Sequence, residues 1–107
     1  MTTFNDRERG EEAKHALDEE TLFRINARRN RLLGHWAAEL MGLSAEETDA
    51  YAKAVIQADF EEAGDEDVIR KVLGDLISAG VDTDEAAVRA ALQAKQIEAR
   101  RALMGEV

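Results

Sequence analysis

Apolar residues recur every three or four positions along four segments of this chain, the spacing that places them on one face of an α-helix. The first segment covers residues 18–41, and Gly42 fits the left-handed position that follows a helix. The side chains expected to face inward in this segment are Leu22, Ile25, Leu32, Leu33, Trp36, Ala37 and Leu40. No part of the chain shows a convincing strand alternation, so the pattern predicts an all-α protein.

The starts and stops of the other three helices carry local signals. Ser44 with Glu47 has the spacing of a capping box, and Asp82 with Glu85 could form another. We expect the third helix to begin at Asp65 or Asp67 and the fourth at Asp82 or Thr83. Glycines are expected to end these three helices at Gly64, Gly80 and Gly105.

Short connections between the helices favour antiparallel neighbours, so the chain is expected to fold as an antiparallel four-helix bundle over residues 18–107. Gly34 and Gly74 lie inside helices, where Gly costs about 1 kcal/mol relative to Ala. Both are interpreted as helix crossing points, and Gly34 could instead leave room for a ligand. The inward positions of the last three helices are expected to be Tyr51, Val55, Ala58, Val68, Ile69, Val72, Leu73, Leu76, Ile77, Val88, Ala91, Leu92, Ala99 and Leu103.

Residues 1–17 differ from the rest because their only large apolar side chains, apart from the initiator Met, are Phe4 and Leu17. Such a segment buries too little surface to offset the entropy of ordering it. It is nevertheless rich in good helix formers. We therefore expect a flexible N-terminal segment that becomes helical on a partner.

Composition narrows the class of protein. The 107 residues suffice for one domain, and the net charge of −9 opposes binding to nucleic acid or anionic lipid. There is no Cys, which excludes disulfides and zinc–thiolate sites. No apolar run reaches the length of a membrane span, and no secretion signal is present, so a cytoplasmic protein is expected.

The first helix carries a cationic stripe on the face opposite its apolar stripe. Arg24, Arg28, Arg31 and His35 share one side of the helix, and Arg29 borders them. The stripe is either a solvated face or a surface for a phosphorylated small molecule or an acidic partner, since Arg offers bidentate geometry to phosphate. Trp36, which follows His35, is either an ordinary core residue or a side chain that stacks on a base.

Acidic residues gather around Gly64 without the spacing of a calcium loop, and helix-start charges and caps explain Asp65 to Asp67. Asp59 is the exception, and it could pair with an Arg of the first helix. Ser and His residues form no nucleophile elbow, and no phosphate-binding glycine loop is present. We therefore expect a non-enzyme that requires no cofactor.

Three parts of the chain, residues 3–8, 27–39 and 58–71, together resemble the zeta subunit of alphaproteobacterial F-type ATP synthases. The resemblance covers nearly the whole chain. It implies a four-helix bundle that binds ADP or ATP, and an N-terminal segment that blocks ATP hydrolysis at a catalytic interface between the alpha and beta subunits. The gamma subunit is a further expected partner. The resemblance also places the protein at the cytoplasmic, soluble head of the synthase, as a monomer when free.

For the two roles that the resemblance implies, the cationic stripe and the charged N-terminal segment supply the candidate residues. Phosphate contacts are expected from Arg28, Arg29 and Arg31, with Trp36 near the base. The inhibitory residues are expected to be Phe4, Arg7, Arg9 and Lys14. Two alternatives stay open: a nucleotide-responsive helical module that binds another target, and a purely structural adaptor.

Overall fold

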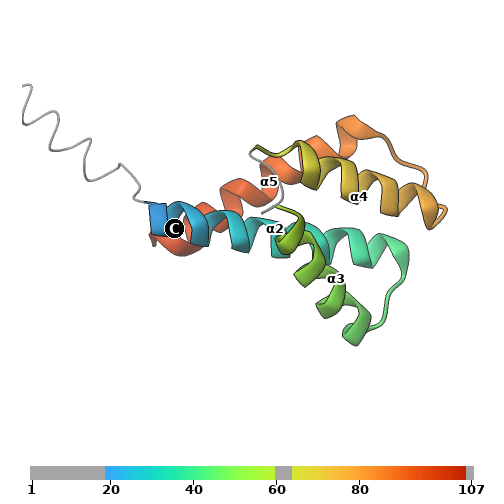
Figure 1. Ribbon diagram of the computed structural model, residues 1–107, viewed down its shortest axis with the longest axis horizontal. Coiled ribbons are helices and arrows are strands. Elements are labelled where there is room, and N and C mark those ends of the chain that lie inside the picture. Colours follow the sequence, from blue (N-terminus) through green and yellow to red (C-terminus); the bar gives the residue numbers. More distant parts are fainter. Residues whose placement is uncertain (1–18, 60–63, 106–107) are drawn as a thin grey trace, which may run out of the picture.

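The computed structural model describes residues 19–59 and 64–105 of the chain. Successive helices run in opposite directions along the molecule (Figure 1), which confirms the predicted antiparallel all-α architecture. The predicted flexible segment, residues 1–17, lies outside the described residues. The four helices are α2 (Glu19–Met41), α3 (Ala45–Ala58), α4 (Glu66–Ser78) and α5 (Glu85–Met104).

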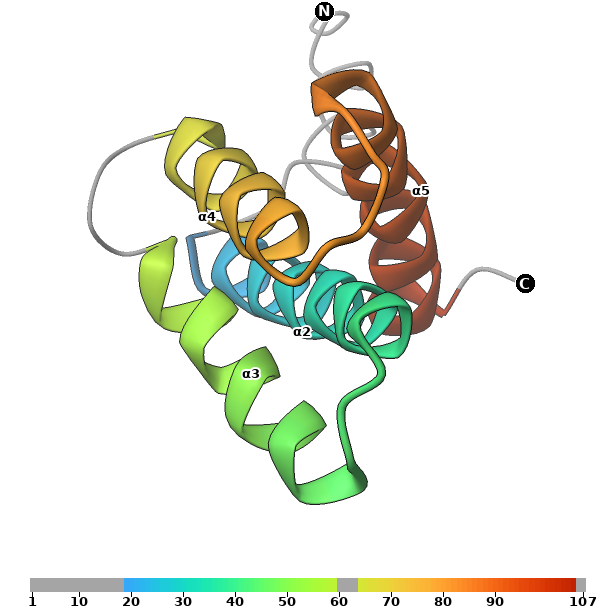
Figure 2. The same cartoon turned by 90° about the vertical axis from the view of Figure 1, so that its right-hand side faces the viewer.

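Helix α2 is the centre of the fold because it packs against each of the other three helices, whereas α3 and α5 do not contact one another in the described part of the chain. Figure 2 looks along α2 and shows α3, α4 and α5 arranged around it. The shared core consists of Leu33, Ala37, Val55, Val68, Ile69, Val72, Leu76, Val88 and Leu92. None of the described helices covers the side of α2 that faces away from α4.

Helix starts follow local capping chemistry. Ser44 and Glu47 form the expected capping box, with the Ser44 hydroxyl accepting from the Glu47 amide at 3.1 Å and the Glu47 carboxylate accepting from the Ser44 amide at 2.8 Å. The prediction for the last helix was wrong by two residues. Asp84, not Asp82, is the cap, because its carboxylate accepts from the Ala87 amide at 2.9 Å.

The prediction of inward positions was wrong at four large side chains. Leu22, Leu40, Ile77 and Leu103 are between 40% and 55% exposed. Each lies in the first or last turn of its helix, where the neighbouring helices no longer cover it. Helical periodicity marks the correct face, but burial depends on how far the partner helix extends.

A polar link joins α3 to α4 beside the core. The Tyr51 hydroxyl donates to Asp75 at 2.8 Å, and Lys71 pairs with the same carboxylate oxygen at 3.1 Å. Burial, reinforced by the bond to Asp75, raises the pKa of the Tyr51 hydroxyl well above its ordinary value. Tyr51 thus faces inward as predicted, with its polar end satisfied.

Of the two helical glycines, one is a crossing point and the other is not. A Cβ on Gly34 would lie 2.8 Å from the Ala52 Cα atom, so α2 and α3 approach closely there. Space for a ligand at Gly34 is therefore ruled out, because the α3 backbone occupies it. Gly74 has no neighbour within 4 Å of an added Cβ and is exposed, so its assignment as a crossing point was wrong.

The two glycines should respond to alanine in opposite directions. Gly34→Ala should lower the free energy of unfolding by about 1–2 kcal/mol, because overpacking against the α3 backbone outweighs the gain in helix propensity. Gly74→Ala should raise it by about 0.5–1 kcal/mol, because only propensity changes. Urea denaturation followed by circular dichroism measures both. Equal effects of the two substitutions would contradict the close crossing.

Candidate functional site

The open side of α2 carries arginines around a shallow apolar hollow. Arg24, Arg28 and Arg31 are exposed and follow one another at the spacing of a single helix face. The hollow has a volume of about 290 Å³ and also includes Ala27, Phe23, Ile56 from α3 and Leu103 from α5. The surface therefore combines positive charge with an apolar floor built from three helices.

Two of these arginines are free to bind an anion. Arg28 and Arg31 form no ion pair with any residue in the ranges 19–59 and 64–105. Arg24 pairs with Glu20 one turn earlier at 2.7 Å, but both side chains are exposed, so this bond exchanges readily with water or a ligand. The stripe is thus a solvated face, and the charges of Arg28 and Arg31 are not neutralised by acids in the described part of the bundle.

Arg29 does not lie on this surface, although it neighbours Arg28 in the sequence. Its side chain is only 4% exposed, and it pairs with Asp65 at 3.1 Å and with Asp59 at 3.6 Å. Its guanidinium also donates to Gln96 of α5 at 3.1 Å. Arg29 therefore holds together the end of α3, the start of α4 and the middle of α5. The predicted pairing of Asp59 with an Arg of the first helix is confirmed.

Sequence reasoning missed the buried polar cluster around Arg29. Asn30 is fully buried, and its side-chain oxygen Oδ1 accepts a hydrogen bond from the Arg29 Nε atom at 3.0 Å. The Arg29 Nη2 and Asn30 Nδ2 atoms are buried without a hydrogen-bond acceptor among residues 19–59 and 64–105. A signal was present in the sequence: Arg29 stands four residues from both Ile25 and Leu33, which are core positions.

Trp36 and His35 line a different hollow, of about 600 Å³, together with Glu39, Asp49 and Lys95 among others. Trp36 is half-buried and packs against the core, and the Nε2 atom of His35 is buried. The structure therefore does not bring Trp36 or His35 to the hollow of Arg28 and Arg31. The apolar side chains that do lie beside these arginines are those of Phe23, Ile56 and Leu103.

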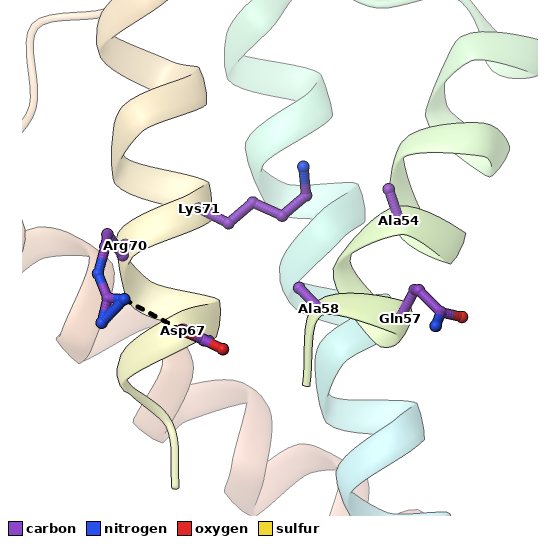
Figure 3. A pocket seen from close by; sticks show the side chains of 6 residues that line it. All are labelled: Ala54, Gln57, Ala58, Asp67, Arg70 and Lys71. Carbon is purple, nitrogen blue, oxygen red and sulfur yellow. Dashed lines mark hydrogen bonds and ion pairs between the residues drawn. The ribbon is translucent and has the colours of Figure 1, made fainter. Parts of the chain in front are cut away.

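A third hollow, of about 400 Å³, lies between α3 and α4 (Figure 3). Its two cations already have acidic partners: Arg70 pairs with Asp67 at 3.0 Å and Lys71 with Asp75 at 3.1 Å. An anion entering here would compete with these carboxylates. The hollow beside Arg28 and Arg31 is the better anion site for that reason.

The acidic residues around Gly64 lie at the start of α4 or form ion pairs. Glu66 pairs with Arg89 of α5 at 2.7 Å, and this hydrogen bond lowers the pKa of the Glu66 carboxyl. Among the described residues, no three acidic or His side chains are grouped so as to hold a metal ion. In the same part of the chain, no helix is both long and apolar enough to cross a membrane.

Comparison with known proteins identifies a similar solved structure and a matching family. A protein with a solved solution NMR structure is 50% identical to this chain, covering 79% of this chain and 96% of its own, with a TM-score of 0.69. No curated protein matches significantly. The family described as ATPase inhibitor subunit zeta matches residues 1–102, which include both the N-terminal segment and the bundle. By this match over nearly its whole length, the chain belongs to the family of ATPase inhibitor zeta subunits.

Proposed function

We propose that this chain inhibits ATP hydrolysis by an F-type ATP synthase, and that residues 1–17 do so by inserting between an alpha and a beta subunit. The observation that carries the proposal is the match of residues 1–102 to a family of ATPase inhibitor subunits. That match includes the charged N-terminal segment with Phe4, Arg7, Arg9 and Lys14, as well as the bundle. The site of action is the cytoplasmic head of the synthase, where the gamma subunit is a further contact.

The composition of the N-terminal segment supports an inhibitory role that is separate from the bundle. Phe4 is an apolar anchor at one end, and Arg7, Arg9 and Lys14 supply positive charge along its length. A cleft that buries Phe4 and presents carboxylates to these cations would order the segment as a helix. The core formed by the described residues runs from Ile25 to Ala99.

The direct test adds the purified full chain to the isolated soluble ATPase head and follows ATP hydrolysis. The expected result is saturable inhibition at a stoichiometry of one chain per head. A head that hydrolyses ATP equally fast at every concentration would favour the alternative, in which the chain is a helical binding module with another target.

We further propose that ADP or ATP binds the open face of α2. Arg28 and Arg31 hold the phosphates, and the base lies against Phe23, Ile56 and Leu103. Support comes from the unpaired charge of the two arginines and from the apolar hollow beside them. Arg29 is left out of this contact set because it is buried and paired with Asp59 and Asp65. Trp36 is left out because it lines another hollow.

Titration of ADP into isotope-labelled protein tests this site. An Arg–phosphate contact contributes about 1.5–3 kcal/mol when it is partly desolvated. Backbone signals near Arg28 and Ile56 should therefore move first, and Arg28→Gln/Arg31→Gln should weaken binding by about tenfold or more. The matched control is Lys53→Gln/Arg70→Gln, which removes the same charge elsewhere. Largest shifts around Trp36 and Lys95 would instead assign the nucleotide to the other hollow.

A further inference from the structure

Most of the unpaired charges in the described part of the bundle are separated by sign along its length, with Glu19 as an exposed acid without an ion pair at the cationic end. Among the described residues, five Lys or Arg side chains form no ion pair: Arg100 and Arg101 in the last turns of α5, Arg28 and Arg31 in the middle of α2, and Lys53 in α3. In Figure 1 the first turns of α2 and the last turns of α5 lie at the same end of the molecule, and Leu103 of α5 lines the same hollow as Phe23 and Arg24 of α2. We call the region formed by residues 19–31 of α2 and the last turns of α5 the arginine end; its unpaired cations are Arg28, Arg31, Arg100 and Arg101.

The opposite end of the bundle is acidic. Glu39, Glu46, Asp49 and Asp82 are exposed there and form no ion pair with another described residue. They lie in the last part of α2, the first turns of α3 and the connection from α4 to α5. The chain is acidic overall, at −9, yet it presents one cationic end. Such a separation orients a molecule in the field of a charged partner.

The arginine end also exposes apolar surface. Phe23 is 52% exposed, Leu22 is 41% exposed and Leu103 is 40% exposed. Leu103 and Phe23 border the hollow between α2, α3 and α5. An apolar centre rimmed by arginines is the composition expected of a protein-binding surface, in which Arg and aromatic side chains are enriched.

The position of the N-terminal segment links this surface to a partner. Residues 1–18 join the bundle at Glu19, the first residue of α2, and thus at the arginine end. As a helix they would span about 27 Å, at 1.5 Å per residue. If the segment occupies a cleft, the arginine end must therefore lie at or near the mouth of that cleft.

We propose that the arginine end is a docking surface for an acidic protein surface on the ATPase head, beside the cleft that receives residues 1–17. This inference rests on the proposed function. It adds a second contact, made by the folded bundle, to the contact made by the N-terminal segment. A compact acidic patch on a protein fits better than a nucleic acid or a lipid surface, because an extended anionic partner would also meet the acidic end of the bundle.

Arg100 and Arg101 allow a test that leaves the proposed nucleotide contacts intact. Arg100→Glu/Arg101→Glu in the full chain should raise the concentration for half-maximal inhibition of the head by about tenfold, chiefly through slower association. The difference from the unmodified chain should narrow at roughly 0.5 M salt, because exposed charges are screened. The control Lys53→Glu/Arg70→Glu changes the net charge equally and should inhibit like the unmodified chain.

Folding and the alternatives are monitored in the same experiment. Arg100→Gln/Arg101→Gln, which avoids acidic side chains near the C-terminal end of α5, should give an intermediate loss of inhibition with unchanged helix content. Unchanged inhibition by both Arg100/Arg101 variants would overturn the docking surface while the proposed function stands. If the unmodified chain neither binds nor inhibits the head, the proposed function and the docking surface both fail. Binding to phosphatidylglycerol vesicles that is lost in the Glu variant, with inhibition intact, would assign the end to a membrane instead.

Discussion

Deletion of residues 1–14 is expected to abolish inhibition of the ATPase head while the bundle stays folded. The deleted stretch contains Phe4, Arg7, Arg9 and Lys14, the side chains proposed to enter the catalytic interface. The core among the described residues runs from Ile25 to Ala99, and we expect its packing to survive the deletion. ATP hydrolysis by the head, measured against increasing concentrations of the truncated chain, should stay at the uninhibited rate.

The control for this deletion is the fold of the truncated chain itself. Its thermal transition should remain cooperative, and it should still bind ADP. Within the full chain, Phe4→Ala should weaken inhibition more than Thr2→Ala, because ordering a segment consumes roughly 2–5 kcal/mol and the loss of an anchor leaves little surplus. A truncated chain that inhibits as strongly as the full chain would move the inhibitory surface onto the bundle.

Substitution of Arg29 is expected to destabilise the bundle far more than substitution of the exposed arginines beside it. Arg29→Met should lower the free energy of unfolding by about 3 kcal/mol, because it leaves Asp59 largely buried without its cation. The Asp59 side chain is 16% exposed, so water compensates only partly. The substitution also removes the contacts that tie α2 to Asp65 and Gln96. Urea denaturation gives the difference directly.

Arg31→Met is the matched control, since Arg31 is exposed on the same helix and should change stability by no more than about 0.5 kcal/mol. Asp59→Asn should fall between the two, because Asp65 still pairs with Arg29. Nucleotide affinity should follow the opposite order, with Arg31→Met weakening it and Arg29→Met leaving it nearly intact in the folded fraction. Equal stability of the Arg29 and Arg31 variants would show that the buried cluster contributes little.

The helices could be predicted from sequence because their signals are local. Ser44 and Glu47 act within one turn of each other, and Gly42 takes the left-handed conformation, with φ of 75°, that ends α2. Asp82 and Asp84 are both possible caps of α5, and which of them caps the helix depends on the path of the chain between α4 and α5. Val81 closes the end of α4 by donating to Leu76 at 3.0 Å, and α5 begins only after the following extended residues.

The candidate site was less predictable because it combines residues from separate helices. The stripe of Arg24, Arg28 and Arg31 is evident in the sequence, but Ile56 and Leu103 join it only through the packing of α3 and α5 on α2. Arg29 was misleading because a cation next to a cationic stripe is normally solvated. Its burial requires Asp59 and Asp65, which stand on either side of the connection between α3 and α4. The inhibitory role itself rests on family resemblance, not on spacing or charge.

Cross-linking from position 4 tests the central mechanism most directly. A photoreactive phenylalanine analogue replaces Phe4 in the full chain, which is then irradiated on an ATPase head that is hydrolysing ATP. Insertion of the N-terminal segment predicts adducts with an alpha and a beta subunit at their shared catalytic interface, and their yield should follow the loss of hydrolysis. Adducts confined to the outer surface of the head, at full inhibition, would contradict insertion.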